Sequence, residues 1–148
     1  MANITHINPS QEDGISPVID FGLSHAVVAE NATVVFVSGQ IGWDKNSNLV
    51  GPGNLAAQVA QAHDNIRVVL RKAGATPRNV VRMTTYVVNY KPEDGQTIVD
   101  ANKKFFGENT PCAQTLLGIE SLFTPDMLVE VEVTAVICAK KKRGLNIS

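Results

Sequence analysis

Length and charge set the class of this protein. With 148 residues, 44% of them hydrophobic, the chain is long enough for one α+β-sized domain with a real buried core, and no break in composition suggests a second domain. The net charge of −1 and the isoelectric point of about 6.3 exclude an overall attraction to nucleic acid or to anionic membranes. We therefore expect a single domain over residues 1–148 that folds without a disulfide or a metal ion.

Cysteine content and hydropathy predict a cytoplasmic location. Cys112 and Cys138 lie far from any CxxC spacing, as is typical of a reduced intracellular protein. The N-terminus lacks the order of a signal peptide, and no apolar run approaches the roughly 18 residues of a membrane span. A basic run begins the segment 140–148; because it is short and has no interleaved aromatic residues, a solvated tail is favoured over a nucleic-acid-binding one.

The first part of the chain predicts a polar lead followed by a β-hairpin. Residues 1–20 form a polar N-terminal lead that contains prolines. Two β-rich runs follow, at 26–30 and 33–38. Asn31-Ala32 between them is typical of a turn, which favours pairing of the two runs as a hairpin.

The middle of the chain predicts a loop and a helix. Residues 45–54 are rich in Asn, Gly and Pro, which indicates a loop. Asn54 is placed to cap a helix that continues to residue 73 with apolar residues at helical spacing, and Gly74 is a typical helix stop.

The last part predicts two strands around a second helix, then a final strand. The strands are residues 80–88 and 115–119, and the helix begins near Pro92 and ends at Gly107. Residues 128–138 give the clearest strand, because valines alternate with glutamates and threonine.

This order of elements predicts an α+β fold, a mixed sheet with two helices on one face. The strands at 33–38 and 80–88 carry Val or Phe on both sides, so the face opposite the helices is also expected to be apolar. A trimer in which three sheets close around a barrel-like centre would bury that face.

Three segments in register resemble the RidA/YjgF family, also called endoribonuclease L-PSP-like. The resemblance runs from about residue 22 to residue 139. Its motifs are VFVSGQI at 35–41, the pieces NI, AGA, NVV and TTYV between residues 65 and 87, and LVEVEVTAV at 128–136. The resemblance implies a chorismate-mutase-like fold and a homotrimer with small-molecule clefts at its subunit interfaces. It further implies an imine or enamine deaminase, a hydrolase that uses neither cofactor nor metal.

The resemblance also implies a site, and this chain departs from it. Family members hold the substrate carboxylate with an arginine, and the matching stretch 111–115 reads PCAQT, with Gln114 in the arginine's place. Leu23 stands where the family has a tyrosine, and Leu116 where many members have a cysteine. The framework positions Ser38, Gly39 and Glu130 are retained. The resemblance implies that Glu130 positions or activates the attacking water.

Other candidate residues have a structural explanation beside a functional one. Glu130 and Glu132 are two residues apart on a strand, so they point to one face and lie about 6–7 Å from each other. Such a pair either does acid–base work or forms a solvated face. We assign Glu132 the structural role. Cys112 is expected to border the cleft and to contact the ligand. We expect its thiol to be passive rather than nucleophilic, because no His or Lys lies near it in sequence. Trp43 is either a cleft wall or a packing residue. His63 is expected on a helix surface, and Cys138, at the end of an apolar strand, is expected in the core.

Two functions of different classes follow. The first is a RidA-like enzyme acting on a small imine or related metabolite, with Glu130 positioning water and Gln114 favouring ligands that lack a bare carboxylate. The second is a trimeric small-molecule-binding or regulatory module without turnover. An arginine from elsewhere, such as Arg82, would restore the missing charge. Ribonuclease activity is the least favoured, because the chain lacks a basic patch. We expect no nucleic-acid and no membrane partner.

Overall fold

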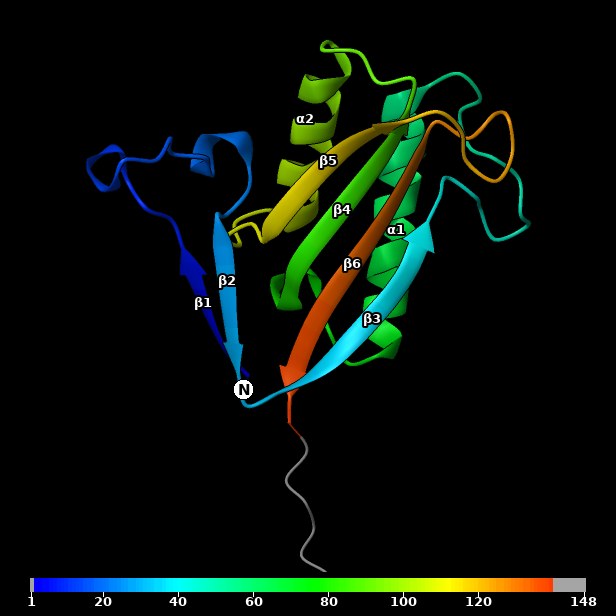
Figure 1. The fold of residues 1–148 in the computed structure, drawn as a ribbon. Helices are drawn as coiled ribbons and strands as arrows, with labels where there is room; N and C mark the ends of the chain where they lie inside the picture. Colours follow the sequence, from blue (N-terminus) through cyan, green and yellow to red (C-terminus); the bar gives the residue numbers. More distant parts are fainter. Residues whose placement is uncertain (1, 140–148) are drawn as a thin grey trace, which may run out of the picture.

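The computed structural model describes residues 2–139, so the basic tail expected at 140–148 lies outside the described residues. A four-stranded mixed sheet forms the centre of the molecule, with the strand order β3-β6-β4-β5 (Figure 1). β6 pairs antiparallel with both β3 and β4, whereas β4 and β5 run parallel. The bounds are β3 Ala32–Gln40, β4 Val80–Val88, β5 Ala113–Ile119 and β6 Val129–Cys138.

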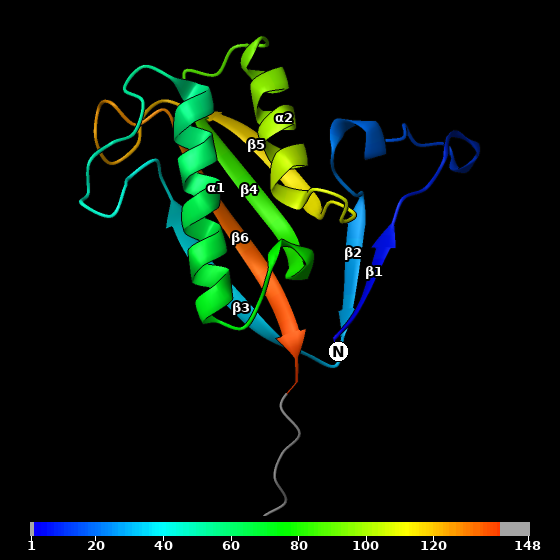
Figure 2. The same cartoon turned by 180° about the vertical axis from the view of Figure 1, so that it is seen from behind.

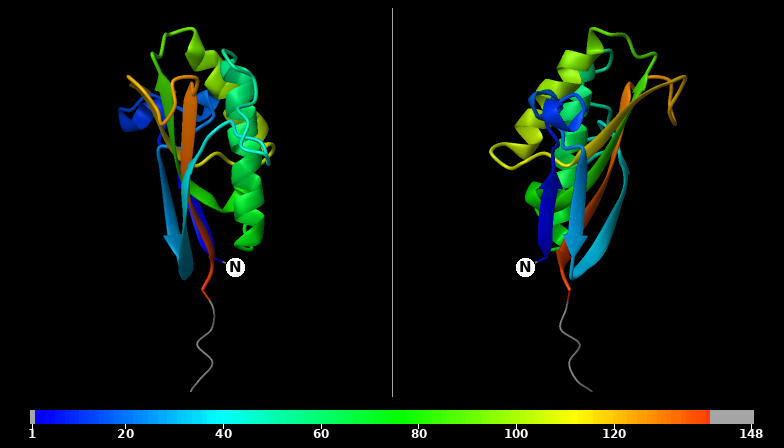
Figure 3. Two further views of the ribbon diagram at one scale, coloured as in Figure 1. Left: turned by 90° about the vertical axis from the view of Figure 1, so that its right-hand side faces the viewer. Right: turned by 60° about the vertical axis from the view of Figure 1, so that its left-hand side comes forward.

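Two helices, α1 Leu55–Lys72 and α2 Asp94–Phe106, cover one face of this sheet and leave the other open (Figures 2 and 3). This arrangement confirms the predicted α+β fold. Ile66 and Leu70 of α1 are completely buried against the sheet. Each such side chain stabilises the fold by about 1.5–3 kcal/mol relative to exposure. Among the described residues, none of the helices has both the length and the apolarity that crossing a bilayer requires.

Local sequence signals explain these elements. Along β6, Val129, Val131 and Val133 are buried beneath the helices. The intervening Glu130, Glu132 and Thr134 therefore point to the open face. Asn54 caps α1 as predicted, because its side chain accepts the backbone N–H of Ala57. Short 3₁₀ turns complete the chain at Gln11–Asp13, Ile19–Phe21 and Pro77–Asn79.

The N-terminal part differs from the prediction. β1 (Asn3–Ile7), which lies within the expected polar lead, pairs antiparallel with β2 (Ala26–Glu30) in a separate two-stranded sheet. The predicted hairpin between β2 and β3 is therefore wrong. The chain does reverse at Asn31, but β2 and β3 diverge from that point (Figure 1). The cause is a long-range contact: Ser24, just before β2, donates its backbone N–H to Cys112 beside β5.

The open face of the sheet is mixed rather than uniformly apolar. Val34 and Phe36 of β3 are 48% and 82% exposed on it. The central strand β4 instead presents Arg82 and Tyr86, which are bonded across the sheet to Thr115 and Glu132. Exposed apolar side chains thus lie at both edges of the open face, Val34 and Phe36 on β3 and Leu117, 44% exposed, on β5.

Two side chains lie opposite to expectation. His63 is 2% exposed, because it faces α2 and stacks against Phe105 with 4.8 Å between ring centroids. Cys138, expected from sequence in the core, is exposed, because the alternation along β6 places it on the same side as Thr134, opposite the helices, at the last position of the strand. Burial, together with the nearby Arg67 charge, lowers the pKa of His63 to about 4.

His63 makes stability depend on pH. The unfolded histidine titrates near pH 6.5 and the folded one near pH 4, so the unfolded chain binds more protons between these values. The free energy of unfolding has its full value above about pH 6.5 and falls by about 3 kcal/mol as the pH drops toward 4. Urea unfolding at pH 7.5 and 4.5 should show this loss, and His63→Gln should reduce it. His25→Gln is the control; an equal effect of both substitutions would contradict the assignment.

Candidate functional site

One group of the predicted site residues meets where β3 ends and β6 begins. The β3–β6 register is irregular between Val37 and Gln40, and Gly39 lies in this irregularity. The Glu130 carboxylate occupies the space beside Gly39 that a Cβ would need. Glycine at residue 39 is therefore required for the carboxylate to lie against the β3 backbone. Ser38, the preceding residue, is exposed on the open face.

The chain that leaves this group is held in place from α1. The Asn65 side chain donates to the carbonyl oxygens of Ile41 and Trp43, at 3.0 and 2.9 Å. Trp43, half-buried, also bridges to Leu49 across the loop. Ser38, Gly39, Trp43 and Glu130 thus belong to one structural unit, which we call the β3 group.

A second group lies at the β5 edge and contains Gln114. The Gln114 side chain accepts a 2.6 Å hydrogen bond from the Asn102 side chain of α2. Its own amide donates to the Gly22 carbonyl at 2.7 Å. β5 register places Gln114 beside the core residue Met83, so its side chain is on the helix side of the sheet. Both ends of the amide are occupied within the chain.

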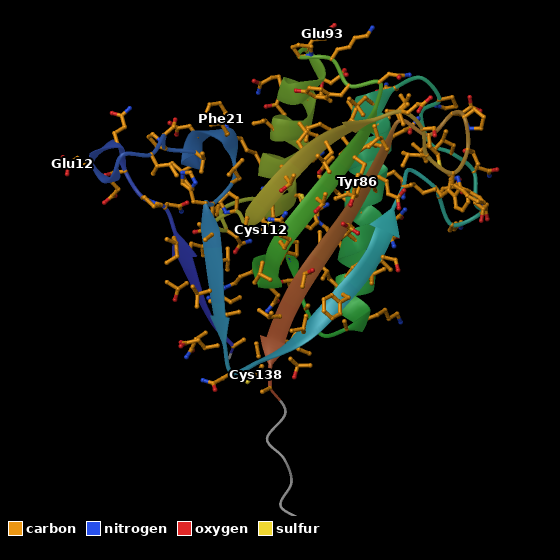
Figure 4. All side chains as sticks on the ribbon, viewed as in Figure 1. Glu12, Phe21, Tyr86, Glu93, Cys112 and Cys138 are labelled. Carbon is orange, nitrogen blue, oxygen red and sulfur yellow. The ribbon has the colours of Figure 1, made fainter. Side chains whose placement is uncertain are left out.

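Cys112, Leu23 and Leu116 complete this second group, which we call the β5 group. Ser24, next to Leu23, donates its backbone N–H to Cys112 at 2.9 Å and its hydroxyl to Pro111 at 2.6 Å. Cys112 is fully buried near the start of β5 (Figure 4), and burial raises the pKa of its thiol to about 12. The thiol is therefore protonated at neutral pH, which is unsuited to a nucleophile. Leu116 is 38% exposed.

The two groups occupy opposite edges of the sheet. β3 and β5 are separated by β6 and β4. At the usual strand spacing this places the edges about 14 Å apart. Within one chain, the residues expected to share a pocket therefore lie in two separate halves.

A hollow of about 550 Å³ lies on the open face between these edges. Ser38 and Phe36 line it from β3, and Arg82 from β4. The Arg82 guanidinium donates to the Thr115 hydroxyl at 2.8 Å, so a cation stands on the same face as Glu130. Tyr86 donates to Glu132 at 2.7 Å, and this hydrogen bond raises the pKa of the tyrosine (Figure 4).

A larger hollow, of about 1130 Å³, lies between β1 and the loops around Arg78 and Asn109. It contains none of the predicted site residues. Among residues 2–139, no three His, Cys, Asp or Glu side chains gather as a metal site would require. The β3 group, with its carboxylate on a backbone bulge, is therefore the stronger candidate for chemistry.

Sequence reasoning did not find Asn102 or Tyr86. Asn102 is buried, and its Oδ1 has no hydrogen-bond partner. A polar residue among the apolar positions of a predicted helix was the available signal. Tyr86 lies within a quoted motif, but only the β4–β6 register, which sets it opposite Glu130, brings it to the site.

The fold and this placement of a glutamate against a glycine bulge define a RidA-type α+β domain. The family model of endoribonuclease L-PSP matches residues 17–137, so the chain belongs to this RidA/YjgF family. It is 32% identical to the rat 2-iminobutanoate/2-iminopropanoate deaminase, over 76% of this chain and 78% of the relative. A RutC family protein of Pyrococcus abyssi is 30% identical, over 68% and 76% of the two chains.

Solved structures agree with this assignment. The Rid-family protein YyfB of Yersinia pestis is 38% identical and superimposes with a TM-score of 0.87, over 91% of this chain and 99% of its own. RidA of a Psychrobacter species is 25% identical, with a TM-score of 0.63 over 77% and 87% of the two chains.

The contact between Gly39 and Glu130 can be tested by a double-mutant cycle. Gly39→Ala should destabilise the protein by about 1–3 kcal/mol, because its methyl group overlaps the carboxylate. In a Glu130→Ala background the same substitution should cost much less, since the obstructing group is gone. Urea unfolding of the four proteins measures this coupling. Equal costs in both backgrounds would mean that the two residues are not in contact.

Proposed function

We propose that this protein hydrolyses a small imine or enamine to a carbonyl compound and ammonia, with Glu130 as the group that positions and deprotonates the water. The contact of Glu130 with Gly39 carries the proposal, since it fixes a carboxylate beside the exposed Ser38 and the backbone of a bulge. The rat relative's name, 2-iminobutanoate/2-iminopropanoate deaminase, supports this reaction class.

The reaction needs one base and one water. The water oxygen bonds to the imine carbon while Glu130 takes a proton from the water, and Glu130 then gives this proton to the imine nitrogen. In the second step Glu130 takes the proton of the carbinolamine hydroxyl and gives it to the amine nitrogen, so that the C–N bond breaks, C=O forms and ammonia leaves. Positioned proton transfer of this kind typically contributes 10²–10⁴-fold to rate.

The complete site, in this proposal, forms between copies of the chain. Each chain carries the β3 group on one edge of its sheet and the β5 group on the opposite edge. A cyclic trimer would set the β3 edge of one copy beside the β5 edge of the next and create three equivalent clefts. The exposed Phe36 and Val34 beside the β3 group support this packing.

Ligand preference follows from charge. Gln114 offers no charge for a carboxylate, and both ends of its amide are already bonded to Asn102 and Gly22. The preferred ligand therefore carries an amide, ester, ring carbonyl or hydroxyl where family substrates carry a carboxylate. Arg82, on the open face, is the alternative source of a cation.

A binding or regulatory module without turnover is the second candidate. The occupied amide of Gln114 and the protonated Cys112 favour it, because neither group adds reactivity to the β5 group. Under this alternative, Glu130 contacts a ligand that stays chemically unchanged. This alternative predicts that Glu130→Ala weakens ligand binding, while the wild type binds the ligand and releases no ammonia.

Ammonia release from freshly generated 2-iminopropionate tests the enzyme proposal. We expect slow hydrolysis by the wild type, a loss of 10²-fold or more in Glu130→Gln, and faster hydrolysis in Gln114→Arg. A guanidinium has five N–H donors, so an arginine at residue 114 can keep the bond to the Gly22 carbonyl and still offer N–H groups and a charge to a carboxylate.

The outcomes of that assay separate the candidates. A wild type as fast as Gln114→Arg would contradict the neutral-pocket proposal, and Arg82→Gln then tests whether Arg82 supplies the charge. Rates unaffected by Glu130→Gln, on this substrate and on a neutral imine, would contradict the catalytic assignment.

Assembly can be tested through the open face. Phe36→Glu places a charge where 82% of an aromatic side chain is exposed, so it should shift the light-scattering mass from three chains toward one at micromolar concentration. Val68→Glu, at a position 51% exposed on α1, is the matched control and should leave the mass unchanged. A wild-type mass of a single chain would contradict the trimer.

A further inference from the structure

Within residues 2–139, β3 has an unpaired outer edge. In the strand order β3-β6-β4-β5 the one strand of this part of the chain that pairs with β3 is β6, although β3 has nine residues and β2 directly precedes it. Its sequence, ATVVFVSGQ, contains neither Lys nor Pro, the residues that usually protect an edge strand. A long unprotected edge strand of this kind is a template for pairing with another strand.

β2 also has one edge that pairs with no other strand of residues 2–139. It pairs with β1 on one side, and the two-stranded sheet that they form is largely exposed, with Val28 at 47%. A two-stranded sheet is marginally stable by itself, so it gains from a third strand. β2 and β3 are also the two strands whose sequences predict pairing with each other.

The same chain is prevented from making this pair. The segment before β2 is fastened to the β5 edge by Ser24 to Cys112, by Ser24 to Pro111 and by Gln114 to Gly22. The β5 edge lies about 14 Å from β3, with two strands between them. Closing β2 onto its own β3 would require all three hydrogen bonds to break.

We propose that β2 of a second copy of this chain pairs antiparallel with β3, so that the copies are linked by exchanged strands. Asn31, at φ 51°, is the hinge residue at which the chain opens instead of folding back. β2, which the sequence predicts to pair with its own β3, thus pairs with β3 of a neighbouring copy, as in domain swapping. Repeated around a symmetry axis, this contact closes a ring.

The exchange also joins the two halves of the candidate site. If the turn at Asn31-Ala32 sets the register, Glu30 lies opposite Thr33, and Ser24 of one copy lies opposite Gly39 of the next. Ser24 and Gly22, the two neighbours of Leu23, are bonded to Cys112 and Gln114, so the β5 group accompanies this segment. Leu23 therefore reaches the Ser38–Gly39 bulge and Glu130 of the neighbouring copy. Each half-site is completed by the other chain.

Disulfide trapping tests this strand pairing. In a Cys138→Ser background, Ala29→Cys is combined in turn with Thr33→Cys, Val34→Cys and Val35→Cys, which covers the expected register and one residue on either side. After mild oxidation, denaturing non-reducing electrophoresis should show bands at two or more chain masses that disappear on reduction. The control pair Ile4→Cys with Ala29→Cys, which are register partners within one chain, should cross-link at a single chain mass.

Two results would overturn the proposal. One is a disulfide confined to single chains in the β2–β3 variants, which would mean that β2 closes onto its own β3. The other is the absence of a disulfide in all three variants while the control forms. The readout is chain connectivity rather than turnover, so a failed deaminase assay and a failed strand exchange are distinguishable.

Discussion

The alternation along β6 is the constraint on which the rest of the structure depends. β6 lies between β3 and β4 and pairs with both, so every residue of it has a fixed side. Val129, Val131 and Val133 are buried on the helix side, and their burial sets the register of the sheet. That register leaves Glu130 on the open face beside Gly39. A slip of one residue would turn the valines to the open face and Glu130 into the core. The same pattern therefore specifies both the fold and the position of the candidate carboxylate.

A polar network on the other side of the sheet decides how the N-terminal segment is placed. Asn102, Gln114 and Gly22 are connected by two short hydrogen bonds that join α2, β5 and the segment before β2. Buried polar groups are costly unless bonded, so this network is a strong local constraint. The residue that resemblance assigns to ligand binding thus has a structural role in the single chain: it helps hold the β1–β2 sheet away from β3.

Much of this could be read from local pattern, and the exceptions share a cause. The bounds of β4, the cap of α1 by Asn54 and the faces of β6 follow from residues within a few positions of each other. The β2–β3 hairpin was predicted on equally good local signals and is not formed. His63 was expected at a surface and is buried, because the packing of α2 against α1 decides which helix positions reach water.

By itself the sequence determined the family and the α+β class, and it singled out Ser38, Gly39 and Glu130 as candidates, because motifs and hydrophobic periodicity are local and can be read along the chain. Only the tertiary structure decided that these residues come together on β3 and β6, while Leu23, Cys112 and Gln114 lie at or beside β5, the opposite edge strand. The reason is physical: a strand's partner is chosen by hydrogen bonds between residues distant in sequence, here Ser24 with Cys112 and Gln114 with Gly22. Such contacts leave no periodic trace along the chain.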